Sequence, residues 1–377
     1  MDLEGIKARE EKCYARTFKR LPVAVERGEG MYLYGTEGKK YLDMFAGIAV
    51  DCLGHAHPRM VEAISRQAAT LTHTSNWVYT LPQIELVERL NRITGQEKAF
   101  VTNDGTEAVE AAFKLARKLT GKKEIIAMEN AFHGRTMGAL SLTHGEKYKK
   151  PFEPLVPGAK AVPYGNAGAV REAITEDTAA VIVEPIQGEA GVIIPPEGYL
   201  KELREITEEK GVLLILDEVQ TGFGRTGRMF ACEHEGVKPD ILCMAKGLGG
   251  GFPVGAIAYS CGDFEPGQHG GTFVGNPLAC SVANAVIDTV VKDRLVDNSN
   301  KMGAYLMDRL KQRGYAVRGK GLMIGIDVAD GAKTVEELIG LGVLIIHSKN
   351  TLRAIPPLII EKKHADEFLA ALDKVSR

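Results

Sequence analysis

The sequence predicts an α/β protein built around a mostly parallel sheet with helices on both faces. Short apolar runs recur along the chain, and helical stretches such as Thr106–Leu119 and Tyr199–Lys210 separate some of them. This alternation is typical of parallel strands joined by helical crossovers. The 377 residues are enough for two domains and a large core. The predicted strands are Glu97–Val101, Glu124–Met128, Ala180–Glu184, Val212–Leu216, Ile241–Met244 and Val254–Ala258.

The two ends of the chain predict a smaller α/β unit. Residues 1–30 are polar with charges at helical spacing, and Met31–Asp43 has the pattern of a short hairpin. A long apolar helix begins near Ala279–Val291 and leaves the sheet region. After it come strands at Tyr315–Val317, Leu322–Asp327, Val343–Ile346 and Thr351–Ile355, with helices at Val335–Leu341 and Lys363–Lys374. We expect an N-terminal segment at 1–45, a large domain at 46–278 and a small C-terminal domain at 279–377.

Composition excludes several classes of protein. Lys and Arg number 47 against 49 Asp and Glu, a formal net charge of −2, so no basic bias points to nucleic acid or to a membrane surface. No apolar stretch is long enough to span a bilayer, and the N-terminus lacks a signal-peptide core. The six cysteines show no C-x-x-C and no framework spacing. They predict a reduced, cytoplasmic protein.

Lys246 and Asp217 are the main candidates for chemistry. Lys246 follows the apolar run 240–245 and precedes a glycine-rich stretch, while Asp217 ends the apolar run 211–216. The interval of 246 − 217 = 29 residues accommodates a crossover and the next strand, so both side chains can meet at the carboxyl edge of one sheet. A lysine that bonds covalently to pyridoxal phosphate, with an aspartate facing the pyridinium nitrogen, fits this arrangement. The glycines follow the lysine, unlike those of a P-loop, and no dinucleotide fingerprint follows a strand.

Two glycine-containing turns are candidates for phosphate binding. Gly105 and Thr106 open a predicted helix, whose free N–H groups and dipole favour an anion. Asp104 would oppose a phosphate, so its side chain should turn away and cap the helix. An ordinary capped helix is the alternative reading. Thr272, flanked by glycines, could reach a phosphate from a neighbouring subunit or could lie in a flexible turn.

Together these residues resemble the class III aminotransferases, within the fold-type I pyridoxal phosphate enzymes. The resemblance covers nearly the whole chain in family order, and it implies a seven-stranded sheet in the large domain, a small domain from both terminal segments, and a homodimer. The matching runs are Gly54–Pro58, Gly105–Ala108, Phe132–Thr136, Val183–Ala190, Leu216–Gly227 with Lys246, Thr272–Pro277 and Arg353–Leu358. One departure is Asp104, which stands where the family usually has serine.

The resemblance also implies roles around the cofactor. Lys246 would hold the cofactor covalently and then move the proton. Asp217 would keep the pyridine nitrogen protonated through a charge-assisted hydrogen bond. Gln220 would donate toward the 3-hydroxyl oxygen of the ring, while Phe132 and Val219 would cover its two faces. Plain core packing is the alternative for the aromatic ring.

Substrate roles follow from the same resemblance. Arg135 would bind a substrate carboxylate through its planar guanidinium, and Arg353 would bind the α-carboxylate of glutamate. Glu184 would line the site. Glu189 would pair with Arg353 when the amine donor has no carboxylate there. Each arginine alone could instead be structural.

Within the family, segments 47–55 and 75–83 resemble the acetylornithine aminotransferase subgroup. Ile48 stands where ornithine aminotransferases have a tyrosine that holds the free α-amino group, which favours an acylated substrate. The implied reaction transfers the δ-amino group of N-acetylornithine to 2-oxoglutarate, in arginine biosynthesis. Open alternatives are succinylornithine, carrier-linked lysine, ornithine or 4-aminobutyrate as the donor, an aminomutase, and a non-catalytic binding protein. His55 and His57 form a His-x-His pair without further ligands, so we expect no metal.

Overall fold

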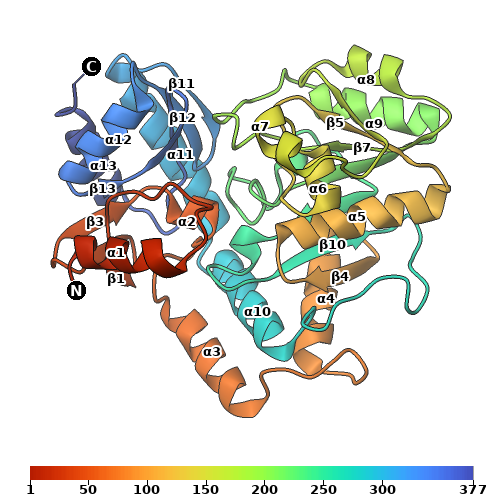
Figure 1. Cartoon of the computed structure of the whole chain (residues 1–377), viewed down its shortest axis with the longest axis horizontal. Helices are drawn as coiled ribbons and strands as arrows, with labels where there is room; N and C mark the ends of the chain where they lie inside the picture. Colours follow the sequence, from red (N-terminus) through yellow and green to blue (C-terminus); the bar gives the residue numbers. More distant parts are fainter. Residues whose placement is uncertain (377) are drawn as a thin grey trace.

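The computed structural model describes residues 1–376 and contains a seven-stranded central sheet with helices on both faces (Figure 1). The strand order is β4-β10-β9-β8-β7-β5-β6. β10 runs antiparallel to both of its neighbours, and the remaining pairs are parallel. The strands are β4 (Lys98–Thr102), β5 (Glu124–Met128), β6 (Ala159–Val162), β7 (Thr178–Val183), β8 (Leu213–Asp217), β9 (Ile241–Met244) and β10 (Gly255–Tyr259). The predicted mostly parallel sheet is confirmed, and β6 is the strand that the sequence reading missed.

Alternating side chains on the central strands explain the two helical layers. Ile125 and Ala127 of β5 pack with α5, whereas Ile126 and Met128 pack in a second cluster with α4 and α9. Successive side chains thus point to opposite faces of the sheet, and both sets are apolar, as expected of a parallel sheet covered by helices on both faces. The helices of this region are α3 (Pro58–Thr70), α4 (Leu81–Thr94), α5 (Gly105–Thr120), α6 (Met137–Leu142), α7 (Glu146–Lys149), α8 (Ala167–Ala173), α9 (Tyr199–Lys210) and α10 (Pro277–Lys292), with short turns η1 (Lys150–Phe152), η2 (Ala231–His234) and η3 (Lys246–Leu248).

The two ends of the chain meet in a second body, the terminal unit, on the left of Figure 1. Its first sheet has the order β1-β2-β3-β13, and β13 pairs in parallel with β3. Its second sheet has the order β11-β12-β15-β14. The elements are α1 (Leu3–Cys13), β1 (Val25–Glu29), β2 (Tyr32–Gly35), β3 (Lys40–Asp43), α2 (Ala46–Ala49), α11 (Leu295–Gln312), β11 (Val317–Lys320), β12 (Met323–Asp327), α12 (Gly331–Gly340), β13 (Val343–Leu344), β14 (Ile346–Ser348), β15 (Thr351–Ala354) and α13 (Lys362–Leu372). The predicted hairpin near residues 31–43 is present as β2 and β3.

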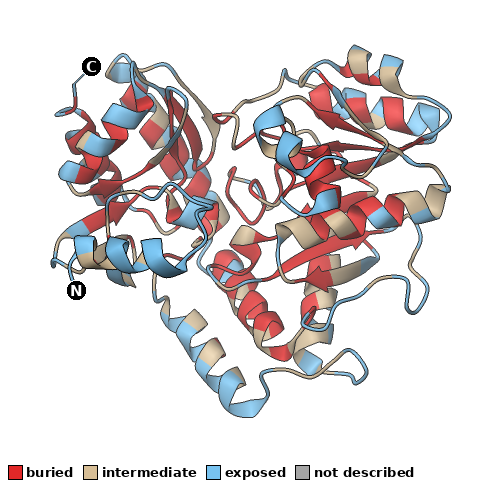
Figure 2. Ribbon diagram, viewed as in Figure 1, coloured by how far each residue is buried: buried red, intermediate tan, exposed pale blue. Residues whose placement is uncertain are grey.

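Burial differs sharply between neighbouring helices. α10 is buried along much of its length, whereas α3 projects from the molecule with mostly exposed or half-buried side chains (Figure 2). The central strands are the most deeply buried elements. Among residues 1–376, no helix combines the length and apolarity needed to cross a bilayer.

Candidate active site

The two main candidate residues, Asp217 and Lys246, lie where the neighbouring strands β8 and β9 end, beside a pocket. β8 ends at Asp217, and β9 is its parallel neighbour, with Asp217 opposite Cys243. Lys246 follows two residues after β9, with φ +44°, at the start of a tight turn. The positive φ bends the chain back at once, so both functional side chains belong to one edge of the sheet. The expectation from the 29-residue interval is therefore confirmed.

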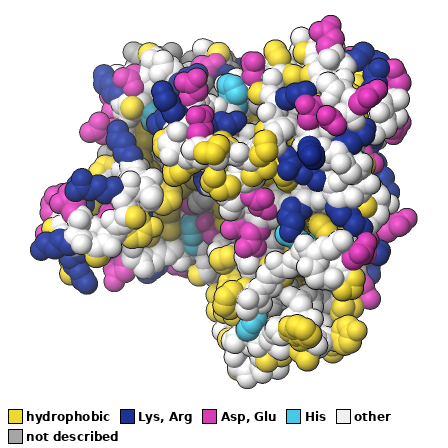
Figure 3. All heavy atoms as spheres, turned by 45° about the vertical axis from the view of Figure 1, so that its right-hand side comes forward, with side chains coloured by type: hydrophobic (Ala, Val, Ile, Leu, Met, Phe, Trp, Pro, Cys, Tyr) yellow, Lys and Arg dark blue, Asp and Glu magenta, His cyan; other side chains and the backbone are white. Residues whose placement is uncertain are grey.

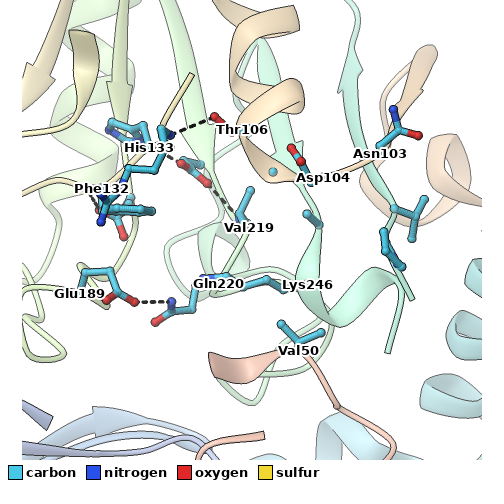
Figure 4. A pocket seen from close by; sticks show the side chains of 18 of the residues that line it. Val50, Asn103, Asp104, Thr106, Phe132, His133, Glu189, Val219, Gln220 and Lys246 are labelled. Atoms are coloured by element: carbon cyan, nitrogen blue, oxygen red, sulfur yellow. Dashed lines mark hydrogen bonds and ion pairs between the residues drawn. The ribbon is translucent and has the colours of Figure 1, made fainter. Parts of the chain in front are cut away.

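These strand ends open onto a cavity of about 410 Å³. That volume lies within the usual range for small-molecule sites. Figure 4 shows side chains from several elements converging on it. The lining residues are Val50, Asn103, Asp104, Gly105, Thr106, Phe132, His133, Gly134, Arg135, Glu184, Glu189, Asp217, Val219, Gln220, Ala245, Lys246, Gly251, Phe252, Pro253 and Val254. The predicted site residues Arg353 and Thr272 are not among them.

Asp217 is held by a histidine for which the sequence reading gave no role. The imidazole Nδ1 of His133 lies 2.7 Å from one carboxylate oxygen of Asp217, and the amide of Val219 donates to the other at 3.0 Å. Burial alone would lower the pKa of His133, but the hydrogen bond to Asp217 and its negative charge outweigh burial and raise that pKa. The raised pKa favours an imidazolium beside the carboxylate. His133 could have been suspected because it directly follows Phe132.

Glu184 ties together two segments of the pocket wall. Its carboxylate accepts from the amide of Phe132 at 2.9 Å and from the amide of Gly188 at 3.4 Å. Burial raises the pKa of Glu184 to about 7, and the negative charge of Asp217 adds to the rise. The residue thus lines the pocket as expected, and it also fixes the backbone of the predicted ring-stacking residue.

The start of α5, where the sequence predicts an anion site, lines the cavity. The carboxylate of Asp104 accepts from the amide of Glu107 at 2.9 Å, which is the capping arrangement predicted from the sequence. Gly105 lies against Val219, so closely that a Cβ there would come within 2.7 Å of the valine methyl group. Thr106 bonds through its hydroxyl to Thr136, 3.0 Å away. The helix therefore begins directly over the pocket, with Val219 beneath it.

Arg135 is exposed and stacks on aromatic rings. Its guanidinium lies 4.3 Å from the ring centroid of Tyr148 and 5.3 Å from that of Phe132. The two rings meet edge to face, with centroids 6.4 Å apart. Such stacking orients the planar guanidinium while leaving its N–H groups free for a carboxylate. Tyr148 is a second contact that the sequence reading missed.

Glu189, which lines the pocket, forms a bidentate ion pair with Arg353, which does not line it. The guanidinium donates to the two carboxylate oxygens at 2.9 and 2.6 Å. Gln220 joins the pair, accepting from Arg353 at 3.1 Å and donating to Glu189 at 3.3 Å, the contact drawn in Figure 4. Burial would raise the pKa of Glu189, but the Arg353 charge outweighs it and lowers that pKa. The amide of Gln220 is therefore directed at this pair, where the sequence reading expected it toward a cofactor hydroxyl.

Lys246 sits among these charged groups. Burial lowers its pKa, although the negative charge of Glu189 acts in the opposite direction. A lysine with a lowered pKa has more of its amine in the neutral, nucleophilic form. Figure 4 shows Lys246 beside Gln220, between Glu189 and the helix start at Asp104.

The remaining predicted site features lie elsewhere. Thr272 is exposed in the loop before α10, outside the cavity. His55 bonds through Nε2 to buried Asp43 at 2.7 Å, which is a structural contact of the kind expected for this turn. No group of three potential metal ligands gathers anywhere in residues 1–376.

The arrangement fits pyridoxal phosphate. A carboxylate paired with histidine can hold a ring nitrogen, and a valine and a phenylalanine are available for the ring faces. The first residues of α5, Gly105 and Thr106, line the same cavity, where the amides at the start of a helix can bind phosphate oxygens. A half-buried lysine with a lowered pKa lies at the same cavity.

The chain belongs to the class III aminotransferases. The family model described as "Aminotransferase class-III" matches residues 13–375, which is nearly the whole chain. These enzymes use pyridoxal phosphate, and one solved ornithine aminotransferase from Toxoplasma gondii is described with that cofactor at partial occupancy in its active site. The seven-stranded fold-type I architecture expected from the resemblance is confirmed.

Particular relatives narrow the family. The acetylornithine aminotransferase of Methanothermobacter thermautotrophicus is 47% identical, covering 100% of this chain and 99% of the relative. The acetylornithine aminotransferase of Methanopyrus kandleri is 49% identical, with 96% of both chains covered. Among solved structures, the ornithine aminotransferase of Toxoplasma gondii superposes with a TM-score of 0.95 at 33% identity, covering 99% of this chain and 94% of that one. The acetylornithine aminotransferase of Elizabethkingia anophelis gives 0.88 at 35% identity, covering 99% and 98%.

Proposed function

We propose that the protein transfers the δ-amino group of N-acetylornithine to 2-oxoglutarate, giving N-acetylglutamate 5-semialdehyde and glutamate. The observation that carries this proposal is the ion pair of Glu189 with Arg353 beside Lys246. An arginine whose charge Glu189 can neutralise suits an enzyme with two amine donors. Only one of these donors has a carboxylate beside the reacting amine. The relatives named acetylornithine aminotransferase, 44–49% identical over nearly their full length, support the same substrate.

The cofactor-facing residues have separate tasks. When bound, pyridoxal phosphate supplies an electron sink for the carbanion formed as the proton leaves the amine-bearing carbon. Lys246 would hold the cofactor and carry that proton in a 1,3-shift, from the amine-bearing carbon to the carbon on the other side of the nitrogen. Asp217, oriented by His133, would keep the pyridine nitrogen protonated. Gly105 and Thr106 would receive the phosphate at the start of α5.

Arg353 and Glu189 would distinguish the two half-reactions. Glutamate has an α-carboxylate beside its reacting amine, and the δ-carbon of acetylornithine has none. With the diamine bound, Glu189 neutralises Arg353 as in this structure; with glutamate bound, the substrate carboxylate replaces it. Arg135, stacked on Tyr148, would bind the remaining carboxylate of either substrate.

We call this exchange of Glu189 for the substrate carboxylate the Arg353 switch, and measuring the two half-reactions separately tests it. Stopped-flow absorbance of the bound cofactor follows each half-reaction alone. Arg353→Ala should cost the glutamate half-reaction roughly 2–5 kcal/mol, because a buried charge pair is truncated, and should cost the acetylornithine half-reaction less. Glu189→Ala should do the reverse. If both variants slowed both half-reactions equally, the Arg353 switch would be rejected, and the Glu189–Arg353 pair would be purely structural.

Ile48 bears on the choice between acetylated and free ornithine. It lies in α2 with φ +68°, is 39% exposed, and stands two residues from Val50 of the cavity wall. An apolar side chain cannot compensate a charged α-amine for lost water. We expect acetylornithine to be preferred by about a hundredfold in kcat/KM, or roughly 3 kcal/mol. Ile48→Tyr should narrow that gap, and equal rates on both donors in the native protein would refute the argument.

We further propose a homodimer, supported by an exposed apolar surface at the lower tip of the molecule (Figure 3). The segment between α3 and α4, at the bottom of Figure 1, contains Trp77 and Tyr79, which are 93% and 97% exposed. An apolar surface of this kind is typical of an interface. The loop that carries Thr272 belongs to the same surface, since Asn76 donates to the carbonyl of Val274 at 2.8 Å. In a symmetric dimer, Thr272 would reach the phosphate site of the partner rather than its own.

We also propose the reducing, cytoplasmic location expected from the sequence. All six cysteines are free in the structure, and four of them are buried. Burial raises the pKa of Cys52 to about 12, which suppresses its thiolate. Fractionation of cells that express the tagged protein would test the location.

A further inference from the structure

The loop that carries Glu189 is seated on the small sheet β11-β12-β15-β14. We name residues 187–193 the Glu189 loop. It is closed by two backbone hydrogen bonds between Gln187 and Ile193, at 3.1 and 3.0 Å. Inside it, the amides of Gly191 and Val192 both donate to the carbonyl of Gly188. The loop is therefore compact, and its position depends on what holds it from outside.

Three residues of the small sheet form a row beneath this loop. Arg318 of β11 pairs with Gly325 of β12, and Gly325 pairs with Arg353 of β15. Directly paired residues of antiparallel strands project to the same face of a sheet. Arg318 and Arg353 thus lie on one face, two strands apart, with a residue lacking a side chain between them.

Gly325 makes room for the backbone of the loop. A Cβ on Gly325 would come within 3.0 Å of the carbonyl oxygen of Gly191 and 3.2 Å of the Cβ of Val192. The loop therefore crosses the sheet directly over Gly325. Its passage between the two arginines brings Glu189 within reach of Arg353 on one side.

Arg318 binds the loop on the other side. Its guanidinium donates to the carbonyl of Gly191 at 2.7 and 3.1 Å and to the carbonyl of Val192 at 3.0 Å. Asp327 holds the guanidinium with contacts of 2.9 and 2.8 Å. A further contact at 2.9 Å goes to Thr351, two residues before Arg353. The Arg318 side chain is 28% exposed, so these bonds form at the margin of the core.

We propose that Arg318 and Gly325 position the Glu189 loop, so that Glu189 approaches or leaves Arg353 by rotation of its side chain alone. Arg318 would then be a positioning residue for the choice between the two amine donors, an inference that rests on the proposed function. If the loop loses its contacts with Arg318 and Gly325, Glu189 no longer lies where it can neutralise Arg353. The diamine half-reaction needs that neutralisation and the glutamate half-reaction does not.

Half-reaction kinetics of Arg318→Met provide the first readout. We expect kcat/KM of the acetylornithine half-reaction to fall about 10- to 100-fold, while that of the glutamate half-reaction stays within about 3-fold. Gly325→Ala changes no charge, yet it pushes against the loop and should produce the same bias. Arg318→Lys should be intermediate because one ammonium cannot replace the fork of donors. Adding Arg318→Met to Glu189→Ala should cause no further loss on the diamine side.

Arg313→Met is the matched control. Arg313 lies in the same terminal unit, is 24% exposed and pairs with Asp373 at 2.9 Å, but it makes no contact with the Glu189 loop in the described structure. It should leave both half-reactions unchanged. A loss of stability alone would affect Arg318→Met and the control in the same way.

Amide hydrogen exchange gives a readout independent of catalysis. In the cofactor-free protein, exchange of the peptide covering residues 187–193 should accelerate by at least about 10-fold in Arg318→Met and not in Arg313→Met. Unchanged exchange in Arg318→Met would overturn the proposal. Equal loss in both half-reactions for either Arg318→Met or Gly325→Ala would also overturn it. If the wild type reacted with another donor and not with acetylornithine, the substrate assignment would fail, while the exchange result would still decide the role of Arg318.

Discussion

At the scale of single residues, burial sets the ionisation of the pocket. Glu184 is 6% exposed, and burial raises its pKa from 4.5 to about 7. The unfolded chain ionises at the lower value, so the stability that Glu184 contributes is complete below about pH 4.5 and is lost as the pH rises through 7. A carboxyl group of this kind opposes folding at neutral pH, although it also organises the pocket wall.

Glu184→Gln should therefore change the pH dependence of stability. Glutamine keeps the size and an acceptor for the amide of Phe132 but does not titrate. The free energy of unfolding of the variant, minus that of the wild type, should rise by about 3 kcal/mol between pH 4.5 and 7 and stay flat above it. Urea titrations of the cofactor-free protein at several pH values measure this difference. A flat difference across the whole range would show that Glu184 ionises normally.

Lys246→Ala should abolish turnover while leaving the cofactor bound non-covalently. The change removes both the covalent link and the carrier of the proton, so activity should fall to a few per cent or less. The visible absorption of the protein-bound cofactor should shift, and added acetylornithine should still perturb it. Substantial remaining turnover would contradict the role given to Lys246.

At the scale of elements, the Asp104 carboxylate stabilises α5, but its negative charge would repel an anion bound at the start of the helix. Its carboxylate caps the helix, yet it lines the cavity where the phosphate is proposed to bind. Asp104→Asn should keep the cap, with stability within about 0.5 kcal/mol, and should tighten cofactor binding about 5-fold by removing a like charge. Asp104→Ala should lose about 1 kcal/mol of stability. Thermal unfolding and cofactor titration separate the two effects, and weaker binding in Asp104→Asn would contradict the argument.

The elements also show what sequence patterns can and cannot predict. Strong apolar runs and the capping signal at Asp104 predicted the central strands and α5 to within a few residues. β6 was missed because Ala159–Val162 is a short edge strand with a lysine in it. The row Arg318–Gly325–Arg353 depends on the register of distant strands, which local periodicity does not determine. Arg353 was found through the resemblance alone, and His133 and Tyr148 were missed because their partners are remote in sequence. The boundaries at residues 45 and 278 stay a prediction.

At the scale of the whole molecule, the exposed apolar tip should govern assembly. Trp77→Asp should shift the proposed dimer toward a monomer, because a charge would be buried in an apolar interface. Phe152→Asp is the control, since Phe152 is 56% exposed on a different part of the surface. Sedimentation measures the assembly state. A native protein that is monomeric and fully active would refute both the dimer and a role of Thr272 in the partner's site.

Thr272→Ala should weaken cofactor binding about 10-fold through the loss of one hydrogen bond to a charged group. The effect should appear only where a dimer forms. A mixed dimer of Thr272→Ala with Lys246→Ala would contain one site that lacks neither residue if Thr272 acts in the partner subunit. Recovery of activity on mixing the two inactive or weakened proteins would support that arrangement, and its absence would contradict it.

The parallel pairing of β3 with β13 has a consequence for biosynthesis. Leu42 pairs with Val343, so 343 − 42 = 301 residues must be translated before β3 acquires its partner. At typical elongation rates the N-terminal hairpin waits about 15 to 60 s with one edge unprotected, long enough for chaperones or other nascent chains to compete for it. Arg353 emerges later still, so its ion pair with Glu189 can form only as synthesis ends.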